Sequence, residues 1–186
     1  MGTSISQGSP TGRSATGQAW SSVKRAVAEG QAPEKVITSI GRAYTTQFGD
    51  DFAEKLVDKG VELTEGLIKN FRGKKSDLGE FIVETKKVIA SNQANSFVAE
   101  LAVTAAGSAI ADNDGNLYET FKARFAEKIV DYAISRDLPE TISTPGLPNL
   151  NSSENLFREV IKSIRSSRQP NETTRNFILR LFGGKK

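Results

Sequence analysis

Apolar residues recur every three or four positions along most of the chain, which is the spacing of one face of an α-helix. One such stripe, formed by Val36, Ile37, Ile40, Ala43 and Tyr44, follows Pro33, a residue suited to the first turn of a helix. The same spacing predicts further helices over residues 20–27, 52–71, 78–89, 94–111, 117–135, 156–164 and 177–182. No alternating run of β-branched residues persists, so the pattern predicts an all-α fold: an irregular helical bundle with a flexible Gly/Ser-rich N-terminal tail.

Breaks in this pattern divide the chain into four parts. Residues 1–32 are expected to form a flexible N-terminal tail with a short helix, because their first half is rich in Gly, Ser and Thr. Residues 33–138 form the helical body. Residues 139–153 read PETISTPGLPNLNSS, and their prolines predict an extended linker that begins where the preceding helix ends. Residues 154–186 form a basic C-terminal helical segment.

Polar residues and glycines mark the expected helix starts and weak points. Asp50 and Ser76 are candidate N-caps of the helices that follow them. Gly60 and Gly66 each weaken the predicted 52–71 helix by about 1 kcal/mol where they are exposed. Close packing of a second helix explains these two glycines as well as any functional role does.

Cysteine and histidine are both absent, which excludes several kinds of chemistry. Zinc sites built on these residues, Ser-His-Asp triads and Cys-His pairs are impossible. The Asp112–Asn116 stretch does not fit a calcium loop, because the positions that should carry the first and last ligands are Ile110 and Phe121. No compact acid–base or nucleophile constellation is visible, so we expect a protein without catalytic residues, metal site or cofactor.

Charge is unevenly distributed, with an acidic middle between two basic ends, although the net charge is only +3. In the C-terminal segment, Arg158, Lys162 and Arg165 accompany three aromatic residues, Phe157, Phe177 and Phe182. The spacing of the aromatics suits the apolar faces of helices, so they pack either in the core or against a partner. These six residues are our candidates for partner binding, as an amphipathic helix docked in another protein's groove. Direct binding of nucleic acid by the basic residues is a third interpretation.

No run of about 18 apolar residues occurs, so no membrane span is expected. The first residues also lack the basic and apolar regions of a secretory signal. A cytoplasmic location follows as the expectation.

The first six residues, MGTSIS, match the N-myristoylation pattern, with Gly2 as the acceptor once Met1 is removed. The α-amine exposed in this way has a pKa near ~8, so a useful fraction is neutral and nucleophilic at cellular pH. An uncharged, glycine-led tail can enter the pocket of another enzyme. The segment therefore resembles a presented substrate, and an ordinary disordered terminus is the alternative.

The start of the chain also resembles the small B proteins of Qat-type bacterial anti-phage defence systems. These proteins open with Met-Gly-Thr-Ser, a further serine and a Gly-Pro pair, before a tryptophan-containing stretch and a helical body. Here the matching positions are Met1, Gly2, Thr3, Ser4, Ser6, Gly8-Ser9-Pro10, Trp20 and the segment Ile40–Ala43.

The resemblance implies partners and a site. It implies a P-loop ATPase, a QueC-like ATP-dependent enzyme and a TatD-like nuclease encoded beside this chain. It further implies that the QueC-like enzyme modifies Gly2, with Thr3, Ser4 and Ser6 as recognition contacts. The function expected is a non-enzymatic defence component that presents its N-terminal glycine and docks on partner subunits. The alternatives are an N-myristoylated membrane-associated adaptor and a nucleic-acid-binding helical protein.

Overall fold

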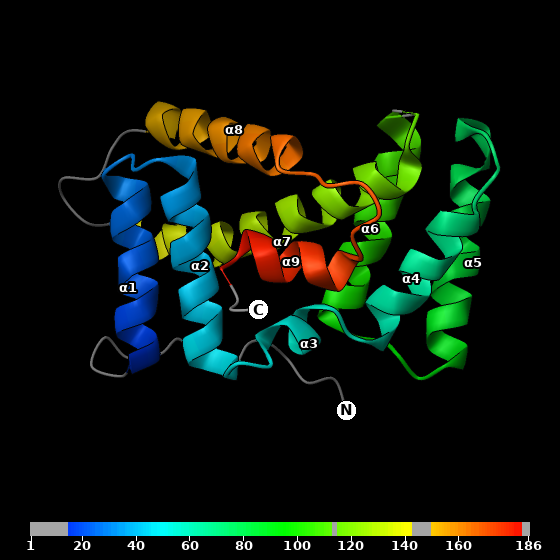
Figure 1. Cartoon of the computed structure of the whole chain (residues 1–186), viewed down its shortest axis with the longest axis horizontal. Coiled ribbons are helices and arrows are strands. Elements are labelled where there is room, and N and C mark those ends of the chain that lie inside the picture. Colours follow the sequence, from blue (N-terminus) through cyan, green and yellow to red (C-terminus); the bar gives the residue numbers. More distant parts are fainter. Residues whose placement is uncertain (1–14, 113–114, 143–149, 184–186) are drawn as a thin grey trace.

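The protein is all-α, as the sequence predicts. The computed structural model describes the backbone of residues 15–112, 115–142 and 150–183, and the side chains of residues 15–112, 115–135 and 154–183. In these residues, nine α-helices and one short 3₁₀ turn, η1, follow one another (Figure 1): α1 Ala15–Ala28, α2 Pro33–Phe48, α3 Phe52–Leu56, α4 Lys59–Asn70, η1 Lys75–Asp77, α5 Leu78–Ser91, α6 Phe97–Asp112, α7 Leu117–Ile142, α8 Leu150–Ser166 and α9 Thr174–Leu181.

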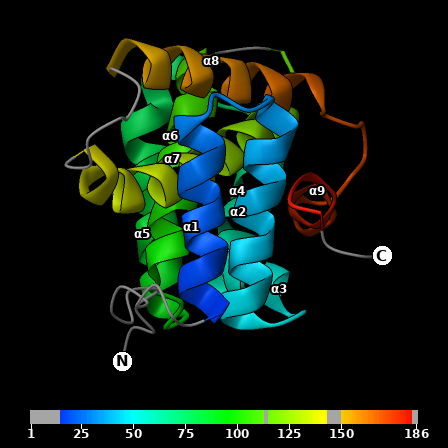
Figure 2. The same cartoon turned by 90° about the vertical axis from the view of Figure 1, so that its left-hand side faces the viewer.

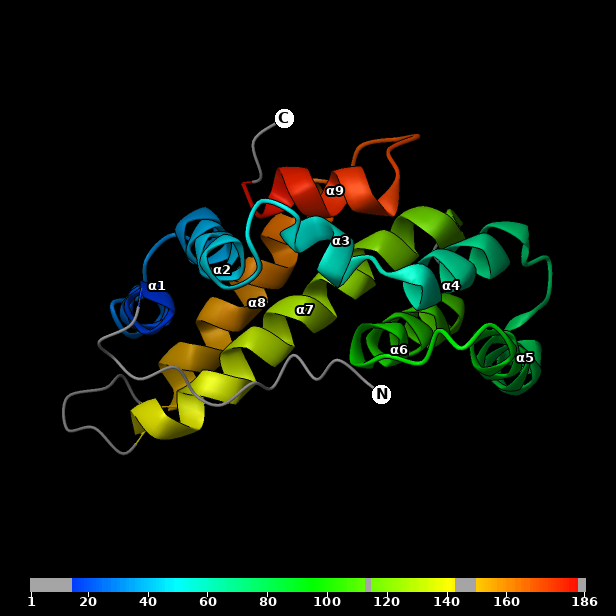
Figure 3. The same cartoon turned by 90° about the horizontal axis from the view of Figure 1, so that it is seen from below.

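The helices form an elongated bundle with two ends joined by α7. The antiparallel pair α1 and α2 makes one end, and α4, α5 and α6 make the other (Figure 1). The long helix α7 packs on helices of both ends. Seen from the α1 end, α8 lies across the top of the bundle and α9 lies beside α2 (Figure 2). The view from below shows α8 running beside α7 (Figure 3).

The N-terminal helix is longer than the short helix expected within residues 1–32. Helix α1 has 14 residues, and Trp20, Val23, Ala26 and Val27 are buried against its neighbours. Trp20 packs edge-on against Tyr44 of α2, with ring centroids 5.4 Å apart. Residues 1–14, where the flexible tail is predicted, lie outside the described residues.

The predicted 52–71 helix is interrupted, and its caps differ from those expected. The chain forms α3 and α4 instead, and the Asp58 carboxylate between them accepts a hydrogen bond from Val61 N at 3.1 Å. Asp50 is therefore not the cap, since α3 begins one residue further along, after Asp51. Ser76 is not a cap either, because it lies within the η1 turn, where the Asp77 carboxylate accepts from Lys74 N at 2.7 Å.

The extended linker predicted for residues 139–153 is shorter than expected at both ends. Helix α7 continues through Pro139 to Ile142, and α8 already begins at Leu150. Proline has a backbone φ that suits a helix, but it removes one backbone hydrogen bond and its ring crowds the carbonyl four residues earlier, which is consistent with α7 ending within a turn of Pro139. The remaining linker residues, 143–149, lie outside the described part of the chain.

The C-terminal helices share the core of the body. Val160 and Ile164 of α8 and Phe177 and Ile178 of α9 are fully buried in the main hydrophobic cluster. Phe182, which follows α9, is 1 % exposed and packs edge-on against Tyr44. Its carbonyl oxygen would lie 1.7 Å from a Cβ atom added to Gly41, so only glycine at this position of α2 admits the end of α9.

Candidate functional site

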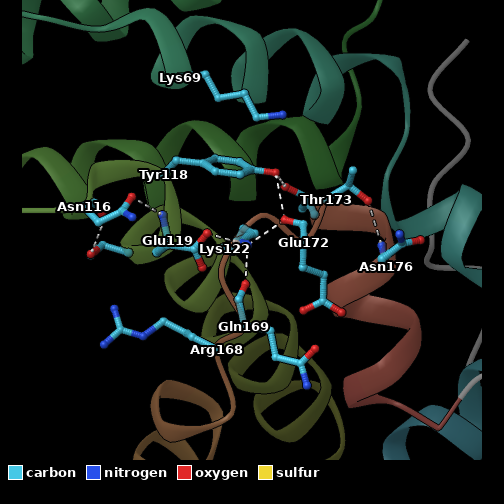
Figure 4. Close-up of polar contacts among 12 residues, drawn as sticks. Lys69, Asn116, Tyr118, Glu119, Lys122, Arg168, Gln169, Glu172, Thr173 and Asn176 are labelled. Carbon is cyan, nitrogen blue, oxygen red and sulfur yellow. Dashed lines mark hydrogen bonds and ion pairs between the residues drawn. The ribbon is translucent and has the colours of Figure 1, made fainter.

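The most concentrated polar chemistry of the described side chains lies at the start of α7 (Figure 4). Tyr118 comes from the first turn of this helix, and its hydroxyl donates to Glu65 Oε1 of α4 at 2.6 Å. Lys69, one helical turn after Glu65, pairs with the same carboxylate oxygen at 2.5 Å and lies over the Tyr118 ring, 4.4 Å from its centroid. The spacing of four residues between Glu65 and Lys69 places them on one face of α4.

A buried lysine forms the centre of this network. The side chain of Lys122 is 0 % exposed, and its ammonium pairs with Glu119 Oε1 at 2.8 Å. The same ammonium donates to the backbone carbonyl of Glu172 at 2.6 Å and lies 3.4 Å from that of Gln169. Lys122 therefore ties the connection between α8 and α9 to α7. A buried charge is tolerated only when it is paired and hydrogen-bonded in this way.

The connection is also fixed from its other side. Arg180 of α9 donates to both carboxylate oxygens of Glu172, at 2.9 and 2.7 Å, and to the carbonyl of Ser167 at 2.7 Å. Asn171, the residue before Glu172 in this connection, has a left-handed backbone conformation, with φ of 64°. Asparagine tolerates this conformation better than most residues, which suits it to the tight turn.

Burial and hydrogen bonding shift three ionisation equilibria in the network. Burial alone would raise the pKa of Glu65, but hydrogen bonds from Lys69, Tyr118 and Thr174 outweigh it, and the pKa is lowered. Burial would lower the pKa of Lys69, but its pairing with Glu65 raises it. For Tyr118, burial and the hydrogen bond to Glu65 both act to raise the pKa.

The hydrogen bonds behind these shifts anchor the start of α7 to α4 and to the connection between α8 and α9. The raised pKa of Tyr118 disfavours the phenolate that a nucleophile or base would need. The carboxylates of Glu65 and Glu172 are engaged in ion pairs, while Glu119 Oε2 is buried without a hydrogen-bond partner. A hollow of about 400 Å³ adjoins the network, lined by Lys69, Asn116, Tyr118, Glu119, Pro170, Asn171, Glu172 and Thr173. Within the described residues, no group of three or more acidic side chains could hold a metal ion.

The sequence did not single out this network. Its helical pairs, Glu65 with Lys69 and Glu119 with Lys122, have the spacing of ion pairs and could have been noticed. The contacts that assemble them join residues about 50 positions apart, such as Lys122 and Glu172, and no local pattern reports them.

The six predicted partner-binding residues differ in their burial, from fully buried to exposed. Phe177 and Phe182 are 0 and 1 % exposed, so the prediction that they contact a partner is wrong, and their apolar rings form part of the core. Phe157 is half-buried and packs against the same core. Arg158 and Lys162 are exposed and lie one helical turn apart on α8.

Much of the C-terminal basic charge is compensated within the molecule. Arg165 pairs with Glu127 at 2.7 Å, Arg175 with Glu54 at 2.6 Å, and Arg180 with Glu172 at 2.7 Å. These arginines come from the segment expected to offer a basic surface. Pairing them with carboxylates weakens the attraction of this surface for phosphate groups, which act through unpaired positive charge.

A groove of about 780 Å³ lies between α5 and α6. The two helices that line it lie at the end of the molecule opposite α1 (Figure 1). No described helix is both long enough and apolar enough to span a bilayer.

The N-terminal candidates Gly2, Thr3, Ser4 and Ser6 lie outside the described residues. Comparison with protein-family models, with curated proteins and with solved structures gave no match.

Proposed function

We propose that this chain is a non-enzymatic subunit of a bacterial anti-phage defence system, whose N-terminal glycine is the substrate of a QueC-like partner enzyme. The observation that carries the proposal is the segment Met1–Ser6, with a glycine behind the initiator methionine and small uncharged residues after it. This segment resembles the start of the Qat B proteins. The proposal implies a cytoplasmic protein that works beside a P-loop ATPase and a TatD-like nuclease.

The distance between Gly2 and the first described helix supports this role. Helix α1 begins at Ala15, and the residues before it span up to about 3.3–3.6 Å each when extended. That length is sufficient for the Gly2 amine to enter a partner's active site while the helical body stays folded. The folded body that carries this segment begins with α1, whose residues Trp20, Val23, Ala26 and Val27 are buried in the core.

The test is the mass of the mature N-terminal peptide. The chain is produced together with the neighbouring genes of its source, and the intact protein and its N-terminal peptide are weighed. We expect an added mass confined to that peptide in the wild type, and no addition in Gly2→Ala. Gly12→Ala, a second glycine of the same stretch, is the matched control and should be modified like the wild type.

Protection against phage is measured in the same strains. Gly2→Ala should lose protection, and Gly12→Ala should keep it. An unmodified Gly2 amine in protein isolated from a fully protected strain would contradict the proposal.

A second candidate function is an N-myristoylated adaptor, which is favoured by the match of Met1–Ser6 to the acylation pattern. One acyl chain binds membranes only marginally, so a basic surface is needed as well. Arg158 and Lys162 are the exposed basic pair on α8, while three other arginines are paired with carboxylates. The mass of the modified peptide separates the two functions, because a fatty acid is released by hydrolysis and identified directly.

A further inference from the structure

The groove between α5 and α6 is lined by apolar side chains, of which Leu78 and Ile82 are half-buried and partly open to solvent, whereas Ile89, Ala99 and Val103 at its floor are only 1–4 % exposed. Its floor and walls include Leu78, Ile82 and Ile89 of α5 and Ala99, Val103 and Gly107 of α6. The volume of about 780 Å³ lies within the range of about 300–1,000 Å³ that binding pockets occupy, and hollows lined by apolar side chains are typical sites of association.

The α6 wall is suited to close packing. A Cβ atom added to Gly107 would lie 3.4 Å from the Ile82 side chain, so the two helices already approach closely there. The hydroxyls of Thr104 and Ser108 on the rim donate to carbonyls of their own helix, at 2.9 and 3.0 Å. Since these donors are already satisfied, the wall presents mainly carbon to whatever packs against it.

Two opposite charges stand on opposite walls of the groove. Lys86 of α5 and Glu100 of α6 are the charged residues in its lining, and both are exposed. Neither forms an ion pair within the described part of the chain.

These two residues also lie near one level along the antiparallel helices. Ile82 lies beside Gly107, and Ile89 clusters with Ala99, which fixes the register of α5 against α6. The pairing of Ile82 with Gly107 places Lys86 level with residue 103, so Lys86 and Glu100 are separated by about 4.5 Å, a little less than one helical turn, along the groove.

We propose that the occupant of this groove is a second copy of the same chain. The two copies are related by a two-fold axis that runs parallel to α5 and α6, so that α5 of one copy lies opposite α6 of the other. Rotation about this axis does not change the height of a residue along the groove. Lys86 of each copy then faces Glu100 of its partner, so two ion pairs flank an apolar four-helix interface. Such self-complementarity is the signature of an isologous dimer, and it goes beyond the proposed modification of Gly2.

The experiment measures the molar mass of the full-length protein by sedimentation and light scattering over a range of concentrations. The wild type should dimerise. Lys86→Glu and Glu100→Lys should each weaken the dimer by about tenfold or more, because each creates two like-charge contacts. The double variant Lys86→Glu/Glu100→Lys should restore it. Lys87→Glu and Glu84→Lys change exposed charges of α5 that lie outside this groove, and should leave the dimer unchanged.

Circular dichroism of every variant establishes that each one is folded. A wild type that stays monomeric throughout the concentration range overturns the proposal and leaves the groove to a different protein. A dimer that ignores both single reversals, or that the double variant fails to restore, overturns it as well, because the interface then lies elsewhere.

Discussion

At the scale of single residues, two glycines in helices have opposite environments that the sequence could not distinguish. A Cβ atom at Gly41 would meet the backbone of Phe182, whereas a Cβ atom at Gly66 would meet nothing within 4 Å. Gly60 resembles Gly41, because its added Cβ would lie 2.5 Å from that of Ala99. Close helix packing is therefore confirmed for Gly60, while Gly66 lies on an open surface.

We expect Gly41→Ala to lower the free energy of unfolding by about 2–3 kcal/mol, because the end of α9 must move away from α2. Gly66→Ala is the matched control, and it should raise the same free energy by about 0.5–1 kcal/mol through helix propensity. Urea denaturation of the three proteins measures both effects. A Gly41→Ala variant as stable as the wild type would show that the contact with Phe182 is not tight.

The Glu65 carboxylate should give a pH-dependent contribution to stability. Its pKa in the folded protein lies below the ordinary value of 4.5, so its contribution is complete above that value and is lost as the pH falls through the folded pKa. Glu65→Gln should therefore lower the free energy of unfolding by about 1 kcal/mol at pH 7, since a charge-assisted hydrogen bond becomes a neutral one. The difference should shrink towards pH 3.

Urea titrations between pH 3 and pH 7 provide the measurement. Glu62→Gln on the same helix is the control, because Glu62 is 60 % exposed and pairs only loosely with Lys59, at 3.8 Å. Its effect should stay below about 0.5 kcal/mol at every pH. An effect of Glu65→Gln that does not vary with pH would contradict the assignment.

At the scale of helices, periodicity predicted where most elements lie but not where they end. The 117–135 stripe marks the buried face of α7, yet the helix continues through Pro139 to Ile142, beyond the last residue of the stripe. The 52–71 stripe continues across the boundary between α3 and α4. Apolar spacing reports burial, and two short helices that turn around Asp58 can bury the same residues as one long helix.

The element most dependent on a single side chain is the connection between α8 and α9, which Lys122 holds. Lys122→Met should lower the free energy of unfolding by about 3–5 kcal/mol, because it leaves the Glu119 carboxylate buried without its cation. Adding Glu119→Gln to this variant should recover part of the loss. Lys128→Met, on the same helix, is the control and should change stability by less than about 0.5 kcal/mol.

Chemical denaturation of these four proteins and of Glu119→Gln alone completes the double-mutant cycle and gives the coupling between Lys122 and Glu119. If the loss in Lys122→Met were no greater than that in Lys128→Met, the ammonium would not be anchoring the connection.

At the scale of the whole molecule, the sequence predicted the fold class but not how its parts join. The basic C-terminal segment reads as a separate unit because prolines precede it and its charge differs from that of the body. Packing overrides both signals: Phe177 and Phe182 insert between helices from distant parts of the chain. The proposed modification of Gly2 depends on covalent chemistry that another protein supplies. The packing of this chain carries no information about that chemistry.

Because both ends of the molecule share one core, we expect a single unfolding transition. Trp20 is the chain's one tryptophan, is 4 % exposed and contacts Tyr44, which in turn contacts Phe182. Its fluorescence therefore follows the α1–α2–α9 end, while circular dichroism follows all the helices, and the two urea midpoints should coincide.

Phe177→Ala should lower the free energy of unfolding by about 3–5 kcal/mol and so move both urea midpoints together to lower urea concentration. Phe157→Ala, at a half-buried ring, should shift both by less. Two separated transitions would mean that residues 154–186 unfold as an independent unit.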